Sequence, residues 1–129
     1  MKVTKIIREY IEEQVMQKYR ENPELKALWA EAEAQREAWN RDVDQLTKEC
    51  NEKLEALYAK HHDVNRYPKA PYFHTSHYYN QYLPAEGRAH DLDKELRAKC
   101  DQAIKNIIFR LEMGGKKDEI QDMLDEVEF

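Results

Sequence analysis

Residues 22–62 read NPELKALWAEAEAQREAWNRDVDQLTKECNEKLEALYAKHH, and this stretch decides the fold. Asn22 suits the cap of a helix, and Pro23 suits its first position, where a backbone N–H is not needed. Glu24 complements the positive end of the helix dipole. No proline or glycine interrupts the stretch after Pro23. It therefore predicts one helix over 23–62, about 60 Å long at about 1.5 Å per residue.

Apolar side chains recur along this helix at alternating steps of four and three residues, the spacing typical of a coiled-coil seam. The seam steps through Leu25, Trp29, Ala32, Arg36, Trp39, Val43, Leu46, Cys50, Lys53 and Leu57, and Arg36 and Lys53 are the two charged positions that interrupt its apolar side chains. A helix this long cannot bury its seam alone, so we expect two copies to pair as a homodimer. Trp29 and Trp39 would lie in the pairing face, with Arg36 between them in a salt bridge or stacked on an indole ring.

The rest of the chain predicts three shorter helices and one loop. Apolar side chains recur at helical spacing over residues 4–21, 92–113 and 117–127. The loop, residues 63–90, holds three of the four prolines. Together these elements predict a single all-α domain over 1–129, a helical hairpin or bundle built on the long helix.

The lengths of the helices predict how they pack. The first and third helices are each about half as long as the second, so we expect the first along its first half and the third along its second half. Cys50 and Cys100 then lie at similar heights in an antiparallel hairpin. This register predicts two buried, reduced thiols whose Cα atoms are less than about 15 Å apart.

Composition excludes several classes of function. Charged residues make up 36% of the chain, the net charge is −5 and the mean hydropathy is −1.00. Neither a signal peptide nor an apolar run of about 20 residues is visible, so we expect a soluble cytoplasmic protein with no membrane partner. Three glycines, one serine and no CxxC leave no phosphate-binding glycine loop, nucleophile elbow or thiolate zinc site. We therefore expect a non-enzymatic protein without a cofactor.

Residues 67–79, YPKAPYFHTSHYY, concentrate aromatic side chains in a chain otherwise rich in Glu, Lys, Ala and Leu. The aromatic candidates for partner binding are Tyr67, Tyr72, Phe73, Tyr78, Tyr79 and Tyr82. We favour a plug that closes the open end of the hairpin, with some rings left outward to anchor a protein partner. Stacking on single-stranded nucleic-acid bases is a second alternative, beside Arg66, Lys69 and Arg88. Because the loop carries a net charge of only +1, nucleic acid is not the expected main partner.

All five histidines fall between positions 61 and 90. On a helical turn around 74–82, His74 and His77 would present both rings to one divalent metal such as zinc. The remaining ligands would come from His61, His62, Asp63 or His90. A metal-binding protein, or a metal-dependent hydrolase in which the ion activates water, is therefore the first alternative.

The unbroken seam and the missing catalytic motifs favour a helical accessory protein that binds a protein partner and self-associates. Size, helicity and polar composition suggest a small phage or mobile-element product, on composition alone. The acidic stretch 116–129, KKDEIQDMLDEVEF, is amphipathic. We interpret it as a solubilising cap, with a phosphate-mimicking partner surface as the alternative.

Overall fold

The structure, a computed structural model, describes residues 1–75, 77 and 81–129. Within these residues the chain forms four α-helices and a short 3-10 turn, without strands. The elements are α1 (Lys5–Arg20), α2 (Pro23–His61), α3 (Pro84–Glu112), η1 (Lys117–Glu119) and α4 (Ile120–Asp125). The predicted all-α fold class is confirmed. None of the helices in the described part of the chain combines the length and apolarity needed to span a membrane.

α2 is a continuous helix of 39 residues, as predicted. Its cap is the predicted one, because Leu25 N–H donates to Asn22 Oδ1 at 2.9 Å and Pro23 takes the start of the helix. α1 begins in the same way, with Ile7 N–H donating to Thr4 Oγ1 at 3.4 Å. In both helices one polar side chain satisfies an N–H group that has no partner within the helix.

α3 is longer than predicted. It begins at Pro84 rather than at 92, so the predicted loop 63–90 ends at Leu83. Pro84 and Glu86 are ordinary signals of a helix start, but Gly87 in the first turn argues against helix. Contacts with α2 outweigh this cost. The end of α3 is as expected, since Gly114 follows it with φ of 119°, a conformation that favours glycine.

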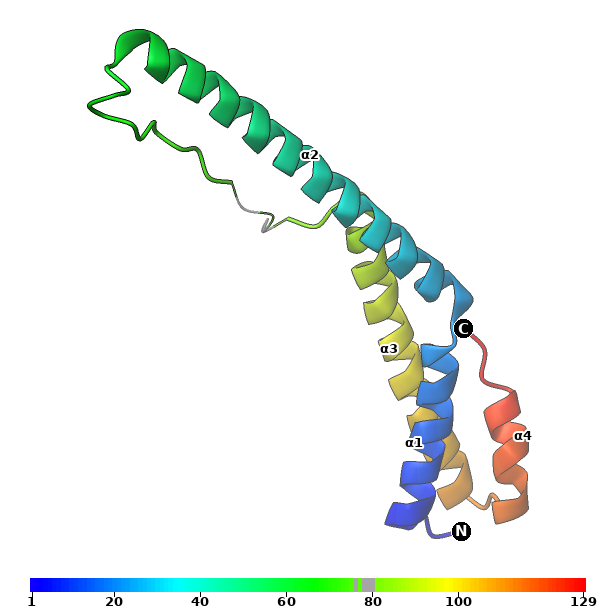
Figure 1. Cartoon of the computed structure of the whole chain (residues 1–129). Helices are drawn as coiled ribbons and strands as arrows, with labels where there is room; N and C mark the ends of the chain where they lie inside the picture. Colours follow the sequence, from blue (N-terminus) through cyan, green and yellow to red (C-terminus); the bar gives the residue numbers. More distant parts are fainter. Residues whose placement is uncertain (76, 78–80) are drawn as a thin grey trace.

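The C-terminal helix is shorter than predicted. In place of one helix over 117–127, the chain forms η1 and then α4, which ends at Asp125. Ile120, Met123 and Leu124 are nevertheless buried, so the amphipathic pattern identified the correct face. The face packs against α1 and α3 at the foot of the molecule (Figure 1).

The core lies between α1, α4 and the C-terminal half of α3, and not along α2 (Figure 1). Its buried members are Ile11, Val15, Tyr19, Leu25, Leu96, Cys100, Ile107, Ile108, Leu111, Ile120, Met123 and Leu124. The predicted packing of the first helix along α2 is therefore wrong. The densest aliphatic run of the chain is in the second half of α3, and it offers α1 more apolar surface than the polar α2 does.

α3 packs antiparallel against the first third of α2. The prediction that the third helix lies along the second half of α2 is therefore wrong. Arg36 Nη2 lies 2.6 Å from Glu86 Oε1, and Ala85 N–H donates to Gln35 Oε1 at 2.9 Å. Closer to the core, Leu25 of α2 belongs to the buried cluster of α3. Beyond Arg36, α2 continues past the start of α3 without a helical neighbour (Figure 1).

This register separates the two cysteines. Cys100 is fully buried in the core, whereas Cys50 is half-buried on the part of α2 that extends beyond α3. The prediction is confirmed for a buried Cys100 and for two free thiols, but it is wrong that Cys50 is buried beside Cys100. It assumed that α3 covers the second half of α2, but the contacts of Arg36 and Gln35 place the overlap in the first half.

Candidate functional site

The most unusual region of the structure is the part of α2 beyond residue 36 together with residues 62–75, which we call the distal arm (Figure 1). Here the long helix projects away from the core, and the chain then turns back beside it. Residues 67–75, the return segment, are not helical. In the described residues, the arm therefore consists of one helix and one non-helical segment beside it, with no helical layer over either.

Side chains of α2 hold the return segment in place. Asn51 Nδ2–H donates to Phe73 O at 2.9 Å, and Phe73 N–H donates to Asn51 Oδ1 at 2.6 Å. Thr47 and Thr75 hydrogen-bond through their hydroxyl groups. Tyr58 O–H donates to Tyr67 O at 2.7 Å. These anchors follow one face of α2, so the return segment covers that face and leaves the neighbouring one open.

The aromatic side chains of this region do not form the predicted plug. Tyr67, Tyr72, Phe73 and Tyr82 are all exposed, and the exposed fraction reaches 62% for Tyr72 and Tyr82. The plug prediction is therefore wrong for these four rings. For Tyr67, Tyr72 and Phe73 the reason is that an irregular segment on a single helix has no second layer to bury them against. Tyr78 and Tyr79 lie outside the described residues.

The predicted metal ligands are dispersed along the arm. His77 Nε2 lies 2.6 Å from Asp44 Oδ1 near the middle of α2, and His74 meets the edge of the Tyr72 ring. His61 and Asp63 lie exposed at the end of α2. Positions 74, 75 and 77 are not helical, so the described residues do not show the helical turn on which the predicted pairing of His74 and His77 depended. Within the described ranges, no three His, Cys, Asp or Glu side chains are arranged to hold a metal ion.

The fifth histidine joins a different cluster. His90 on α3 stacks on Tyr82, with ring centroids 4.2 Å apart, and meets the edge of Trp29 at 5.0 Å. Trp29 is thus in contact with α3 of the same chain. Arg36 forms the predicted interhelical salt bridge, but with Glu86 of α3 and within one chain. Trp39 is half-buried. Much of the face predicted for self-association is therefore used to attach α3.

The apolar seam itself continues beyond this junction. The part that extends onto the distal arm, which we call the distal seam, consists of Val43, Leu46, Cys50 and Leu57. Leu46 is 55% exposed and Leu57 is 56% exposed, while Val43 and Cys50 are half-buried. The face of α2 that contacts α3 near the core is thus left open farther out, because α3 starts only at Pro84.

A second feature lies at the end of the arm, where α2 turns into the return segment. A hollow of 640 Å³ is lined by Tyr58, His62, Arg66, Tyr67, Pro68 and Lys69, and we call it the tip pocket. Four of these residues are predicted from the sequence in separate roles: His62 as a candidate metal ligand, Tyr67 as a candidate for partner binding, and Arg66 and Lys69 as cations beside the aromatic side chains. Tyr58 was missed, although its position four residues before His62 places both rings on one face of the helix.

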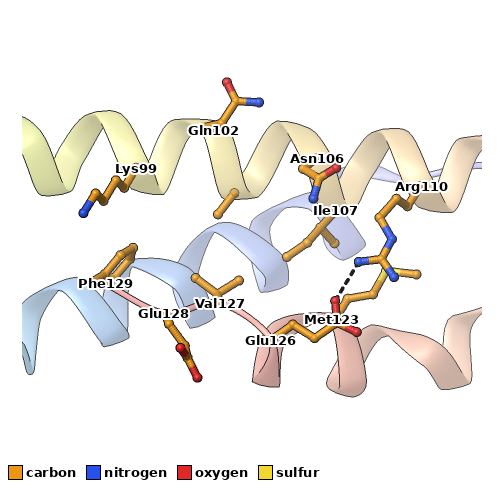
Figure 2. Close-up of a pocket in the computed structure, with 11 residues that line it drawn as sticks. Lys99, Gln102, Asn106, Ile107, Arg110, Met123, Glu126, Val127, Glu128 and Phe129 are labelled. Atoms are coloured by element: carbon orange, nitrogen blue, oxygen red, sulfur yellow. Dashed lines mark hydrogen bonds and ion pairs between the residues drawn. The ribbon is translucent and has the colours of Figure 1, made fainter.

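A groove of 490 Å³ separates α3 from the C-terminal residues, and Figure 2 shows its lining. Arg110 on α3 points across it to Glu126, with Nη1 2.9 Å from Oε2. Gln102 and Asn106 lie on the α3 side of the groove, and Val127 and Phe129 on the opposite side. The acidic C-terminal stretch is therefore tied to the core by an ion pair and by buried apolar residues, which agrees with the cap interpretation.

Comparisons with known proteins give no relative. No family model matches the chain, and no curated protein or solved structure matches it either.

Proposed function

We propose that this chain is a non-enzymatic accessory protein whose distal seam binds a helix of a partner protein. One observation carries the proposal: the face of α2 that packs on α3 near the core continues outward with Leu46 and Leu57 more than half exposed. A helix laid along this seam would extend the packing that α3 begins. Burial of an exposed leucine contributes about 1.5–3 kcal/mol, so a few such residues can support a specific complex.

The charges beside the distal seam indicate the kind of helix that fits. Asp42 and Glu49 lie along its open edge, whereas the opposite edge faces the return segment. Lys53 interrupts the seam between Cys50 and Leu57. We therefore expect a partner helix with an apolar stripe, lysine or arginine along the edge that meets Asp42 and Glu49, and an acidic residue opposite Lys53.

The same charges bear on the predicted homodimer. In an antiparallel pair of two identical arms, corresponding edge positions face each other, so Glu49 would meet Glu49 of the second copy. Like charges at such positions weaken the pair. A different protein with a basic edge therefore suits the seam better than a second copy does.

Site-specific photocrosslinking in the native host tests this proposal. A photoreactive phenylalanine analogue at position 46 should give one dominant adduct, and mass spectrometry should locate the attachment in an amphipathic helix with a basic edge. The same analogue at Lys48, which lies on the other side of α2, is the matched control and should give no such adduct. An adduct of doubled mass would identify a second copy as the occupant. Equal labelling from both positions, or none, would contradict the proposal.

A further inference from the structure

The tip pocket combines flat rings with unpaired positive charge. His62 stacks on Tyr58 in parallel, with centroids 4.3 Å apart and an interplanar angle of 9°. Tyr58 O–H donates to Tyr67 O at 2.7 Å, which ties the end of α2 to the start of the return segment. Tyr58, His62 and Tyr67 all line the hollow at this turn.

The charges of the pocket differ in sign from those of the chain as a whole. The chain carries a net charge of −5, but residues 58–69 hold Lys60, Arg66 and Lys69 against a single acid, Asp63. The Asp63 carboxylate accepts from the backbone N–H groups of Asn65 and Arg66, so it serves the turn and does not line the hollow.

The two cations that line the pocket are available to a ligand. Arg66 lies over the Tyr67 ring, with its guanidinium carbon 5.4 Å from the centroid. In the part of the chain that the structure describes, neither Arg66 nor Lys69 has an acidic partner within salt-bridge distance. Unpaired cations next to flat rings are the combination that binds phosphates and unstacked bases together.

We infer that the tip pocket binds single-stranded nucleic acid. One base lies in the hollow against Tyr67 and Pro68, and the flanking phosphates contact Arg66 and Lys69. Tyr72 and Phe73 are exposed about 17 Å farther along the return segment, at about 3.3 Å per residue, and provide a second stacking surface. A duplex does not fit this arrangement because its bases are already stacked, and an acidic peptide leaves the rings unused. This site is separate from the distal seam and does not depend on it.

Fluorescence anisotropy with the full chain tests the inference. The probe is a fluorescein-labelled single-stranded oligothymidylate of about 12 nucleotides. Binding should weaken with salt, with a log–log slope of about −1.4 for the two phosphate contacts made by Arg66 and Lys69, because each contact contributes about −0.7. Tyr67→Ala should weaken binding about tenfold or more through lost stacking. Arg66→Gln with Lys69→Gln should remove most of this salt dependence, because both phosphate contacts are lost.

Matched variants separate the pocket from the rest of the surface. Tyr10→Ala removes an exposed ring from α1, and Lys5→Gln removes an exposed cation from the same helix; neither should change the affinity. Tyr67→Leu retains apolar volume without the aromatic face and should lose affinity like Tyr67→Ala. Circular dichroism establishes that each variant is folded.

Three results would overturn the inference. The first is no rise in anisotropy at low salt. The second is equal affinity for a duplex of the same length, which would indicate attraction to phosphates without stacking. The third is equal competition by polyglutamate, which would indicate an acidic-peptide site. Leu46→Glu changes the distal seam and should leave the affinity for the oligonucleotide unchanged. The nucleic-acid inference and the distal-seam proposal can therefore fail independently.

Discussion

Cys50 and Cys100 illustrate at the residue scale how position governs the chemistry of a side chain. Cys100 is fully buried among aliphatic residues of the core. Burial raises the pKa of its thiol, Asp101 raises it further, and Arg97 acts in the opposite direction. Cys50 is half-buried on the distal arm. Because the thiolate is the reactive form, the two thiols should differ strongly in reactivity.

A thiol reagent should therefore modify the native chain in two phases. We expect Cys50 to react quickly with Ellman's reagent near neutral pH and Cys100 to react only as the core opens. Cys50→Ser should abolish the fast phase, and denaturant should make both thiols of the natural chain react together. Equal rates of modification for both thiols in the native chain would contradict the structure.

The raised pKa of Cys100 also predicts a pH dependence of stability. The free energy of unfolding should fall as the pH rises past the ordinary thiol range, because the thiol of the unfolded chain ionises first.

At the scale of the element, α2 is uniform as a helix but uneven in its tertiary support. Its only two buried residues are Leu25 and Ala32, both in the first third. Beyond the Arg36–Glu86 salt bridge, support comes from hydrogen bonds to the return segment. Most of the stability of a protein helix comes from packing of its apolar face, so the two ends of α2 should open with different free energies.

Hydrogen exchange measured by mass spectrometry should resolve this difference. We expect slow exchange for peptides that cover residues 24–36 and markedly faster exchange for peptides that cover 45–61. The C-terminal half of α3 provides an internal reference for protection by the core. Uniformly slow exchange along the whole of α2 would mean that the distal arm is covered in solution. A second copy of the chain would then be the first candidate for this cover. A dilution series would reveal it, because exchange along the arm should become faster as the copies separate.

The whole molecule consists of a small helical core with one projecting arm (Figure 1). The core can support such an arm because α1, α3 and α4 bury their apolar faces without using the distal half of α2. The distal seam and the tip pocket lie on this projection, and both are therefore accessible to large partners.

The shape predicts a radius of gyration well above that of a compact domain. A compact chain of 129 residues has a radius of gyration of about 14 Å, whereas α2 alone is about 58 Å long. Small-angle X-ray scattering on a monomeric fraction should therefore give a clearly larger value and an asymmetric distance distribution. The double variant Leu46→Glu with Leu57→Glu should leave the radius of gyration and the distance distribution unchanged. It serves as a control against association of the arms through the distal seam. A value near 14 Å would mean that the arm folds back on the core.

Local signals in the sequence were sufficient for the elements. Asn22 and Pro23 start α2, Thr4 starts α1, and Gly114 follows the end of α3, because caps and left-handed turns depend on one or two residues at a time. The seam of α2 was also readable, since it depends only on spacing along one helix. The start of α3 was missed because Gly87 weakens the local preference and contacts with α2 restore it.

Only the tertiary structure decided which helices cover one another. Apolar stripes on α1, α2 and α3 are similar enough that spacing alone permits several pairings. The choice depends on which combination buries the most apolar area, and the second half of α3 provides it for α1 and α4. That choice placed Cys100 in the core, dispersed the histidines and left the aromatic rings exposed. The sequence by itself thus determined the long helix and its seam. The packing of the whole chain determined which part of the seam stays open, because burial is a property of the assembled helices and not of any one of them.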